Sequence, residues 1–188
     1  MKKFELTSEF VTFLGKKLFR IKALVEFGNV EAGELGGYIE KEENLSQSGD
    51  AWVYGNAWVY GNARVYGNAE VYGDARVYGN ADVYGDARVC GDAEVCGDAE
   101  VYGDARVCGN ADYAYAHGFG SCFRTTTFFR LKDGGVGVRC GCFYGTLQEF
   151  RDKVQETHKN TKKAREYLML ADLMELRFKE ENEDGKNN

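Results

Sequence analysis

The chain contains no proline among its 188 residues, although average usage would give about nine. Glycine is over-represented instead, with 24 residues where average usage would give about 13. Proline lacks a backbone N–H, whereas glycine adopts turn conformations that other residues avoid. The composition therefore favours a fold with many tight turns and continuous backbone hydrogen bonding, and it excludes a collagen-like chain.

Long apolar runs are also missing from the sequence. The run from Tyr167 to Leu170 is far shorter than the roughly 18 residues of a membrane span. Glu5 and Glu9 interrupt the region where a secretory signal would be apolar. We therefore expect a cytoplasmic protein without membrane association. Its six cysteines are then expected to be reduced rather than paired in a disulfide framework.

A six-residue repeat occupies the centre of the chain, between Gly49 and Ala111. Each unit has the form Ala-x-Val-Tyr-Gly-Asn or Ala-x-Val-Tyr-Gly-Asp, with cysteine replacing tyrosine in some units. Alanine and valine lie two residues apart, so both point to one side of a strand while x and tyrosine point to the other. Gly-Asn and Gly-Asp are typical turn pairs. The repeat thus predicts short strands joined by tight turns.

This repeat resembles the hexapeptide repeat of left-handed parallel β-helices, in which three hexads form one triangular coil. The resemblance implies that residues 18 apart are stacked at about 4.8 Å, the spacing of paired strands. Residues 49–112 are then a mainly-β, left-handed parallel β-helix of about three and a half coils. Alanine and valine should fill its interior, and tyrosine and the variable residue should face outward.

A solenoid exposes β-edges at both ends and needs caps. We assign residues 1–48 to an N-terminal cap, with a strand through Phe19, Ile21, Ala23 and Val25 and a turn at Gly28-Asn29. Residues 113–179 predict a C-terminal α+β appendage that contains a hairpin and two helices. The predicted elements are strands at 123–131 and 136–143, a helix from a capping box at Thr146 to about His158, and a helix from Thr161 to about Lys179. Residues 180–188 are predicted to be a disordered tail.

The appendage carries a second resemblance. The phrase Val138-Arg139-Cys140-Gly141-Cys142-Phe143, followed by Gly145-Thr146-Leu147, is similar to a small C-terminal domain of uncharacterised phage and prophage proteins. That resemblance covers about residues 119–178 and implies no catalytic role. Such chains often carry hexapeptide repeats and the label of a transferase. The resemblance implies a phage-encoded protein that acts in the cytoplasm of a bacterial host.

The repeat region also carries the charge of the chain. Residues 51–112 contain four arginines and ten acidic residues, so their net charge of −6 equals that of the whole chain. An acidic prism repels phosphate backbones. We therefore expect no wrapping of nucleic acid around the solenoid, although an arginine could still bind a small anion.

The resemblance to hexapeptide-repeat acyltransferases implies a histidine as general base and acetyl-CoA as cosubstrate. His117, beside the last coil, is the one candidate for that base, and a structural role is its alternative. His158 is placed at the end of a helix, where the helix dipole favours a cation. The γ-class carbonic anhydrases of the same fold bind zinc through three histidines, and the chain has only two.

Three cysteines in the hairpin region, Cys122, Cys140 and Cys142, could bind zinc together with a histidine. Their C-x-C spacing is not the C-x₂₋₄-C of most structural zinc sites, and apolar cysteines in a small core explain them equally well. The leading prediction is therefore a protein without metal or cofactor.

The outward columns of the prism provide the remaining candidates. Seven outward tyrosines, Tyr84 and Tyr102 among them, predict either an oligomer interface or aromatic ladders that stabilise the coils. Hexapeptide-repeat proteins most often form trimers, which the resemblance implies here. Arg88 and Arg106 lie one above the other and predict an anion site, unless nearby acidic residues pair with them.

These observations lead to two hypotheses. The first is a non-catalytic oligomeric binding protein that counters host defence, either by blocking a host effector such as a CRISPR nuclease or by sequestering a nucleotide signal. Its candidate binding residues are Arg88, Arg106, Tyr84 and Tyr102. The alternative is an acyl-CoA-dependent acyltransferase with His117 as general base.

Overall fold

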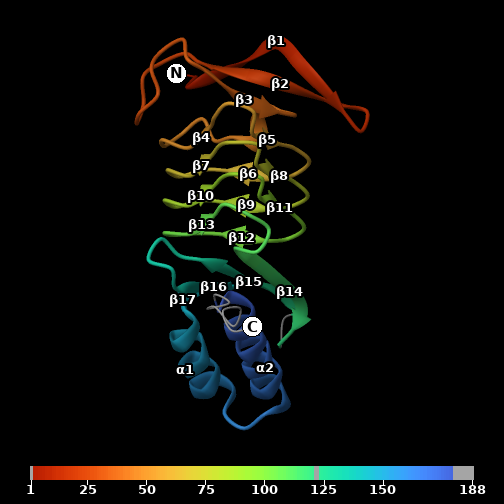
Figure 1. Cartoon of the computed structure of the whole chain (residues 1–188), viewed down its shortest axis with the longest axis vertical. Helices are drawn as coiled ribbons and strands as arrows, with labels where there is room; N and C mark the ends of the chain where they lie inside the picture. The colour runs from red at the N-terminus through yellow and green to blue at the C-terminus, as the bar shows by residue number, and fades with distance from the viewer. Residues whose placement is uncertain (1, 121–122, 180–188) are drawn as a thin grey trace, which may run out of the picture.

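The computed structural model describes residues 2–120 and 123–179, and its centre is a stack of parallel coils (Figure 1). Each hexad contributes one two-residue strand whose valine is fully buried. The ten strands are β4 (Trp52–Val53), β5 (Trp58–Val59), β6 (Arg64–Val65), β7 (Glu70–Val71), β8 (Arg76–Val77), β9 (Asp82–Val83), β10 (Arg88–Val89), β11 (Glu94–Val95), β12 (Glu100–Val101) and β13 (Arg106–Val107). The repeat alanines and valines form one continuous core.

Strands that lie 18 residues apart pair in parallel and build three sheets. One contains β4-β7-β10-β13, the second β5-β8-β11 and the third β6-β9-β12. Valine pairs with valine between coils, as Val59, Val77 and Val95 show. The parallel β-helix predicted from the repeat is therefore confirmed, with alanine and valine inside.

The N-terminal segment adds strands to one of these sheets. β1 (Phe4–Phe13) and β2 (Lys16–Ala23) form an antiparallel hairpin, and β2 pairs with β3 (Leu35–Ile39). β3 then pairs in parallel with β5 and extends the sheet above the first full coil. The predicted strand is confirmed as far as Ala23, and the predicted Gly28-Asn29 turn lies between the bridged residues Phe27 and Val30.

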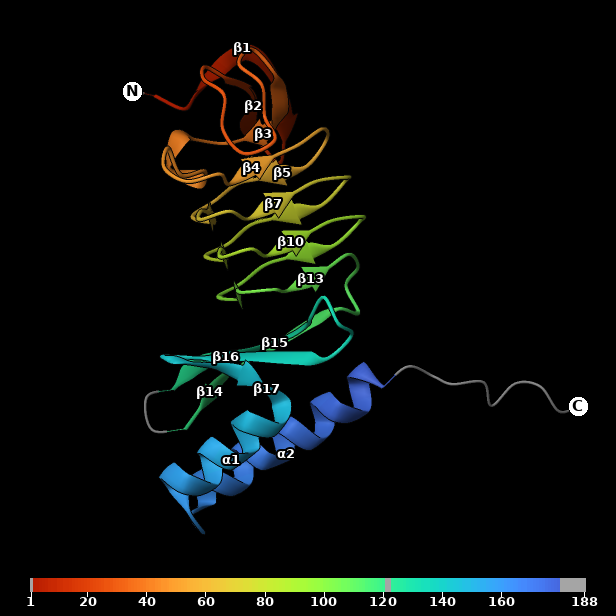
Figure 2. The same cartoon turned by 90° about the vertical axis from the view of Figure 1, so that its left-hand side faces the viewer.

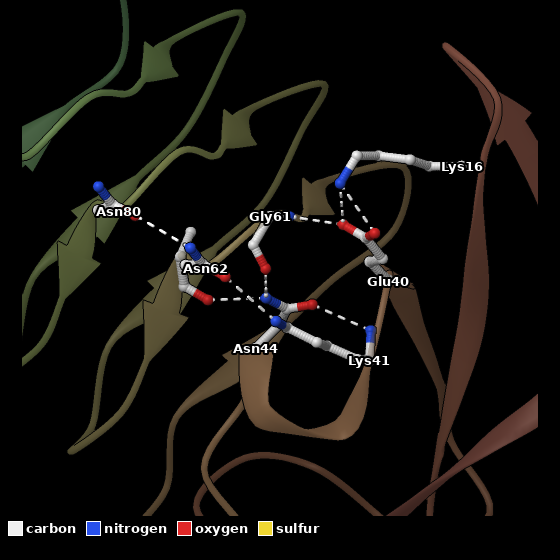
Figure 3. Close-up of polar contacts among 8 residues, drawn as sticks. Lys16, Glu40, Lys41, Asn44, Gly61, Asn62 and Asn80 are labelled. Atoms are coloured by element: carbon white, nitrogen blue, oxygen red, sulfur yellow. Dashed lines mark hydrogen bonds and ion pairs between the residues drawn. The ribbon is translucent and has the colours of Figure 1, made fainter.

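A polar network fixes the chain between β3 and the first coils (Figure 3). Lys16 binds both carboxylate oxygens of Glu40 at 2.8 Å, and Glu40 also accepts the backbone N–H of Gly61 at 2.7 Å. Burial acts to raise the pKa of Glu40, but these hydrogen bonds outweigh it and hold the pKa below its usual value. Asn44, in a 3₁₀ helix at Glu42–Asn44, donates to the carbonyls of Gly61 and Ala63.

The C-terminal appendage is an antiparallel sheet with two helices. Its strands are β14 (Tyr113–Phe119), β15 (Arg124–Arg130), β16 (Val136–Cys140) and β17 (Phe143–Thr146), in that order. The predicted hairpin is confirmed as β15-β16, and β14 and β17 add two further strands. Both predicted helices are confirmed as α1 (Leu147–His158) and α2 (Lys162–Phe178). Thr146 and Glu149 form the predicted capping box.

This sheet separates two cores because its strands alternate their side chains. Phe129 packs with the solenoid core, whereas its neighbour Phe128 packs with α1 and α2. Figure 2 shows β15 and β16 lying across the last coils, with both helices on the far side of the sheet. The backbone N–H of Glu100 donates to the Thr127 hydroxyl, and the backbone N–H of Lys132 donates to the carbonyl of Asp104, so the sheet is bonded to the last coils.

The cysteines differ from the sequence prediction at one point. Cys90 and Cys108 form a disulfide, because the 18-residue spacing stacks them on adjacent coils with Cα atoms 4.3 Å apart. The prediction that all cysteines are reduced is therefore wrong for this pair. Cys122 and the predicted disordered tail at 180–188 lie outside the described residues.

Candidate functional site

The two stacked arginines lie beside a small hollow at one corner of the prism. Arg88 and Arg106 are register partners on β10 and β13, and both side chains are exposed. The hollow has a volume of about 140 Å³. It is lined by Arg88, Arg106 and Lys132 together with Asp86, Asp104 and Ala105. The structure thus brings a third cation, from the loop between β15 and β16, to the predicted arginine pair.

The three cations differ in their partners. The Arg88 guanidinium pairs with Glu70 one coil above, with Nε and Oε2 2.9 Å apart. Arg106 and Lys132 have no carboxylate within ion-pair distance among the described residues. Asp86 already accepts a hydrogen bond from Asn68 at 3.0 Å. The hollow therefore combines two unpaired cations with carboxylate acceptors, which suits a ligand that carries an anionic group and hydrogen-bond donors.

Tyr84 and Tyr102 belong to an aromatic ladder on another face of the prism. Their ring centroids are 4.5 Å apart, and Tyr66 continues the ladder at 4.7 Å from Tyr84. Tyr144 of the appendage packs edge-on against Tyr102 at 4.7 Å. In this column the outward tyrosines therefore form an aromatic ladder that stabilises the coils.

Arg139 of β16 covers the same ladder. Its guanidinium lies 5.5 Å from the ring centroid of Tyr102 and pairs with Glu100 at 2.9 Å. Burial raises the pKa of the Tyr84 phenol, which remains a donor to Glu100 at 3.2 Å. Tyr84 and Tyr102 therefore attach the appendage to the solenoid and are only partly accessible to a ligand.

The most exposed large apolar side chains lie outside the tyrosine columns of the prism. None of the seven prism tyrosines is among the exposed large hydrophobic residues of the described chain, and stacked rings cover those of two of the three columns. On α2, by contrast, Met169, Leu173 and Leu176 are 72%, 54% and 71% exposed. Their spacing of four and three residues places them on one face of the helix. The prism tyrosines are thus half-buried or buried, and the helix α2 carries three of the most exposed apolar side chains of the described residues.

His117 ends a polar ladder that runs down one corner of the prism. Asn62 donates to Asn80 at 3.2 Å, and Asn80 donates to Asp98 at 2.9 Å. His117 Nδ1 lies 4.0 Å from Asp98 and 2.9 Å from the hydroxyl of Thr125. Lys41 faces the other end of the ladder, 3.3 Å from Asn62. His117 is therefore an exposed residue at the end of a row of amide and carboxylate side chains.

The cysteines of the appendage do not gather into a metal site among the described residues. Cys140 is half-buried, accepts a hydrogen bond from Thr126 at 3.1 Å and lies 3.9 Å from the hydroxyl of Tyr167. Cys142 is exposed at the β16–β17 turn. Cys140 therefore belongs to the small core of the appendage.

Sequence reasoning missed Lys132 at the corner hollow and Arg139 on the tyrosine ladder. Both belong to the appendage, which has no repeat, so their positions do not follow from the hexad register. The one available signal was the Asp133-Gly134-Gly135 turn, which places Lys132 at the end of a hairpin strand.

The repeats are similar to a described solenoid unit. A family model with the description YdcK Beta solenoid repeat matches residues 57–73, close to one coil. No curated protein matches the chain. With the observed fold, these findings define a β-solenoid repeat protein. None of the helices in the described part of the chain is long and apolar enough to cross a membrane.

Proposed function

We propose that this protein is a non-catalytic binding protein that captures a phosphate-containing ligand, such as a nucleotide, at the corner formed by Arg88, Arg106 and Lys132. The observation that carries the proposal is the convergence of two unpaired cations and an arginine on one hollow in an acidic protein. Arginine and lysine are the common ligands of phosphate oxygens. Asp86 and Asp104 would accept hydrogen bonds from sugar hydroxyl or base amino groups.

The biological setting of the proposal follows from resemblance. The appendage is similar to domains of phage and prophage proteins, so we propose a counter-defence protein in a bacterial cytoplasm. Of the two hypotheses for its target, sequestering of a nucleotide signal fits the corner hollow. Blocking of a host effector such as a CRISPR nuclease would need a protein-sized contact surface and is kept as an outcome of the test.

The experiment titrates the protein with ADP and with pyrophosphate by calorimetry. We expect both to bind, and Arg106→Gln to weaken binding at least tenfold because one charge-assisted contact is lost. Lys163→Gln, an exposed charge change on α2, is the matched control and should leave affinity unchanged. Absence of binding at millimolar ligand would contradict the proposal, and recovery of a specific host nuclease in a pull-down would then favour the second target.

The acyltransferase alternative has its own measurement. Acetyl-CoA turnover that disappears in folded His117→Ala would show catalysis and contradict a purely binding function. In the structure His117 is an exposed residue that ends a polar ladder, so we expect His117→Ala to leave ligand binding unchanged.

A further inference from the structure

A second cavity lies in the C-terminal appendage, with lining residues different from those of the corner hollow. It has a volume of about 340 Å³ and lies between the β16–β17 turn and the helices α1 and α2. Ligand sites of small molecules typically measure about 300–1,000 Å³ and are mostly apolar with a few polar groups. The cavity therefore has the size of a site for a small organic molecule.

Aromatic rings form much of its wall. Phe150 lies 5.6 Å from Phe143 and 5.7 Å from Tyr167, measured between ring centroids. The His158 ring stacks on the Tyr167 ring, with centroids 5.8 Å apart and an interplanar angle of 28°. The Tyr167 hydroxyl is already engaged, because it donates to the carbonyl of Phe119 at 3.3 Å. Phe150 and Tyr167 are buried themselves, so they form an apolar aromatic floor of the cavity, which favours a flat apolar group.

The charged residues of the lining are all basic. Arg124, Lys153 and His158 contribute to it, and no carboxylate does so among the described lining residues. Lys153 forms an ion pair at 2.7 Å with Glu156, which is not a lining residue. The basic residues around the cavity therefore favour an anionic ligand.

Arg124 is the cation that is available to such an anion. It has no carboxylate within ion-pair distance among the described residues. Its guanidinium crosses the β16–β17 turn so closely that a Cβ added to Gly141 would lie 2.5 Å from Arg124 Nη1. Gly141 has a φ of +59°, so the turn favours glycine for its backbone as well. The turn thus leaves room for the guanidinium beside the aromatic wall.

We propose that this cavity binds a small aromatic monoanion, with its acidic group on Arg124 and its ring among Phe143, Phe150 and Tyr167. The proposal does not depend on the corner hollow, since the two sites share no residue. A guanidinium binds a carboxylate through two parallel hydrogen bonds, which also fixes the orientation of the ring. Specificity would come from the combination of one anionic group and one flat apolar body.

The test compares 2-naphthoate with its uncharged counterpart 2-naphthamide by calorimetry on the full chain. We expect naphthoate to bind at least tenfold more tightly than naphthamide. Arg124→Gln should remove that difference by weakening naphthoate about tenfold while leaving naphthamide within twofold. Arg165→Gln, an exposed charge change on α2, is the matched control and should change neither affinity.

A second variant locates the site. Thr157 is exposed on α1 and lines the cavity, so Thr157→Trp should fill the space without changing the buried core, and it should weaken both probes. Equal affinity for the two probes, no binding of naphthoate at millimolar concentration, or unchanged binding in Thr157→Trp would each overturn the proposal. Circular dichroism of the variants confirms that they are folded.

Discussion

The interior of the prism consists of residues that are small or β-branched. Each repeat valine is fully buried and pairs with a valine of an adjacent coil, and the repeat alanines are buried beside the valines. Branched valine suits an extended backbone, where its single preferred rotamer packs well. The same pair of residues recurs in every hexad. The loss in free energy of unfolding caused by a substitution should therefore depend on whether the replaced side chain points inward or outward.

Val77 and Arg106 test this dependence at the scale of the residue. Val77 is fully buried between Val59 and Val95, so Val77→Asp places an unpaired carboxylate among apolar side chains. We expect the free energy of unfolding to fall by several kcal/mol, enough to unfold a marginal domain. Arg106 is exposed, so Arg106→Ala should change the free energy of unfolding by at most about 0.5 kcal/mol. Urea denaturation of both variants provides the measurement, and equal midpoints would contradict the inside–outside assignment.

At the scale of the element, the open end of the solenoid must satisfy backbone groups that no further coil can reach. Lys3 contributes there, because its ammonium donates to the carbonyls of Gly49 and Ala51 at 3.1 and 2.8 Å. Burial lowers the pKa of Lys3 to about 8, and Asp50 opposes this shift only in part. A buried cation therefore takes the place of the missing strand donors.

The lowered pKa gives a prediction with a defined direction. Between pH 8 and 10.5 the unfolded chain keeps the Lys3 proton while the folded chain loses it, so stability rises with pH in that window. Lys3→Met should destabilise the protein by about 1–3 kcal/mol at pH 7, because two carbonyls lose a charged donor. The difference from wild type should grow from pH 8 to 10.5. Lys2→Met, at an exposed ion pair with Glu42, is the control and should show a small effect without this trend.

Urea titrations at pH 7.5 and 9.5 measure this difference. A constant difference between wild type and Lys3→Met over that range would show that the Lys3 ammonium is not buried at the end of the solenoid.

At the scale of the whole molecule, the N-terminal hairpin and the C-terminal appendage cap the two ends of the solenoid. The β1-β2 hairpin and the appendage lie at opposite ends of the coil stack (Figure 1). Stacked rings cover two of the three tyrosine columns, whereas Met169, Leu173 and Leu176 form an exposed apolar stripe on α2 that a second copy of the chain could bury. We therefore keep the proposal of a homo-oligomer, with the trimer that the resemblance implies, and place its contact on α2.

Leu173 tests this contact. We expect light scattering at micromolar concentration to show an oligomer for the wild type and a monomer for Leu173→Lys, because a charge on the apolar stripe opposes its burial. Arg165→Gln should remain oligomeric. A wild type that is strictly monomeric would contradict the proposal.

The sequence by itself determined the repeating part of this protein and the local elements of its appendage. The hexad places alanine and valine on one side of every strand, and the Thr146 capping box sets the start of α1, because both signals act over a few residues. The 18-residue stacking also placed Arg88 opposite Arg106.

Only the tertiary structure decided how the appendage meets the solenoid. Lys132 reaches the corner hollow, Arg139 covers Tyr102, and Arg124 lies beside an aromatic cavity, although none of the three belongs to a repeat. Their positions depend on how a four-stranded sheet packs across the last coils. That packing arises from contacts between residues far apart in the chain. The appendage has no sequence repeat, so the pairing of such residues cannot be predicted from a regular spacing.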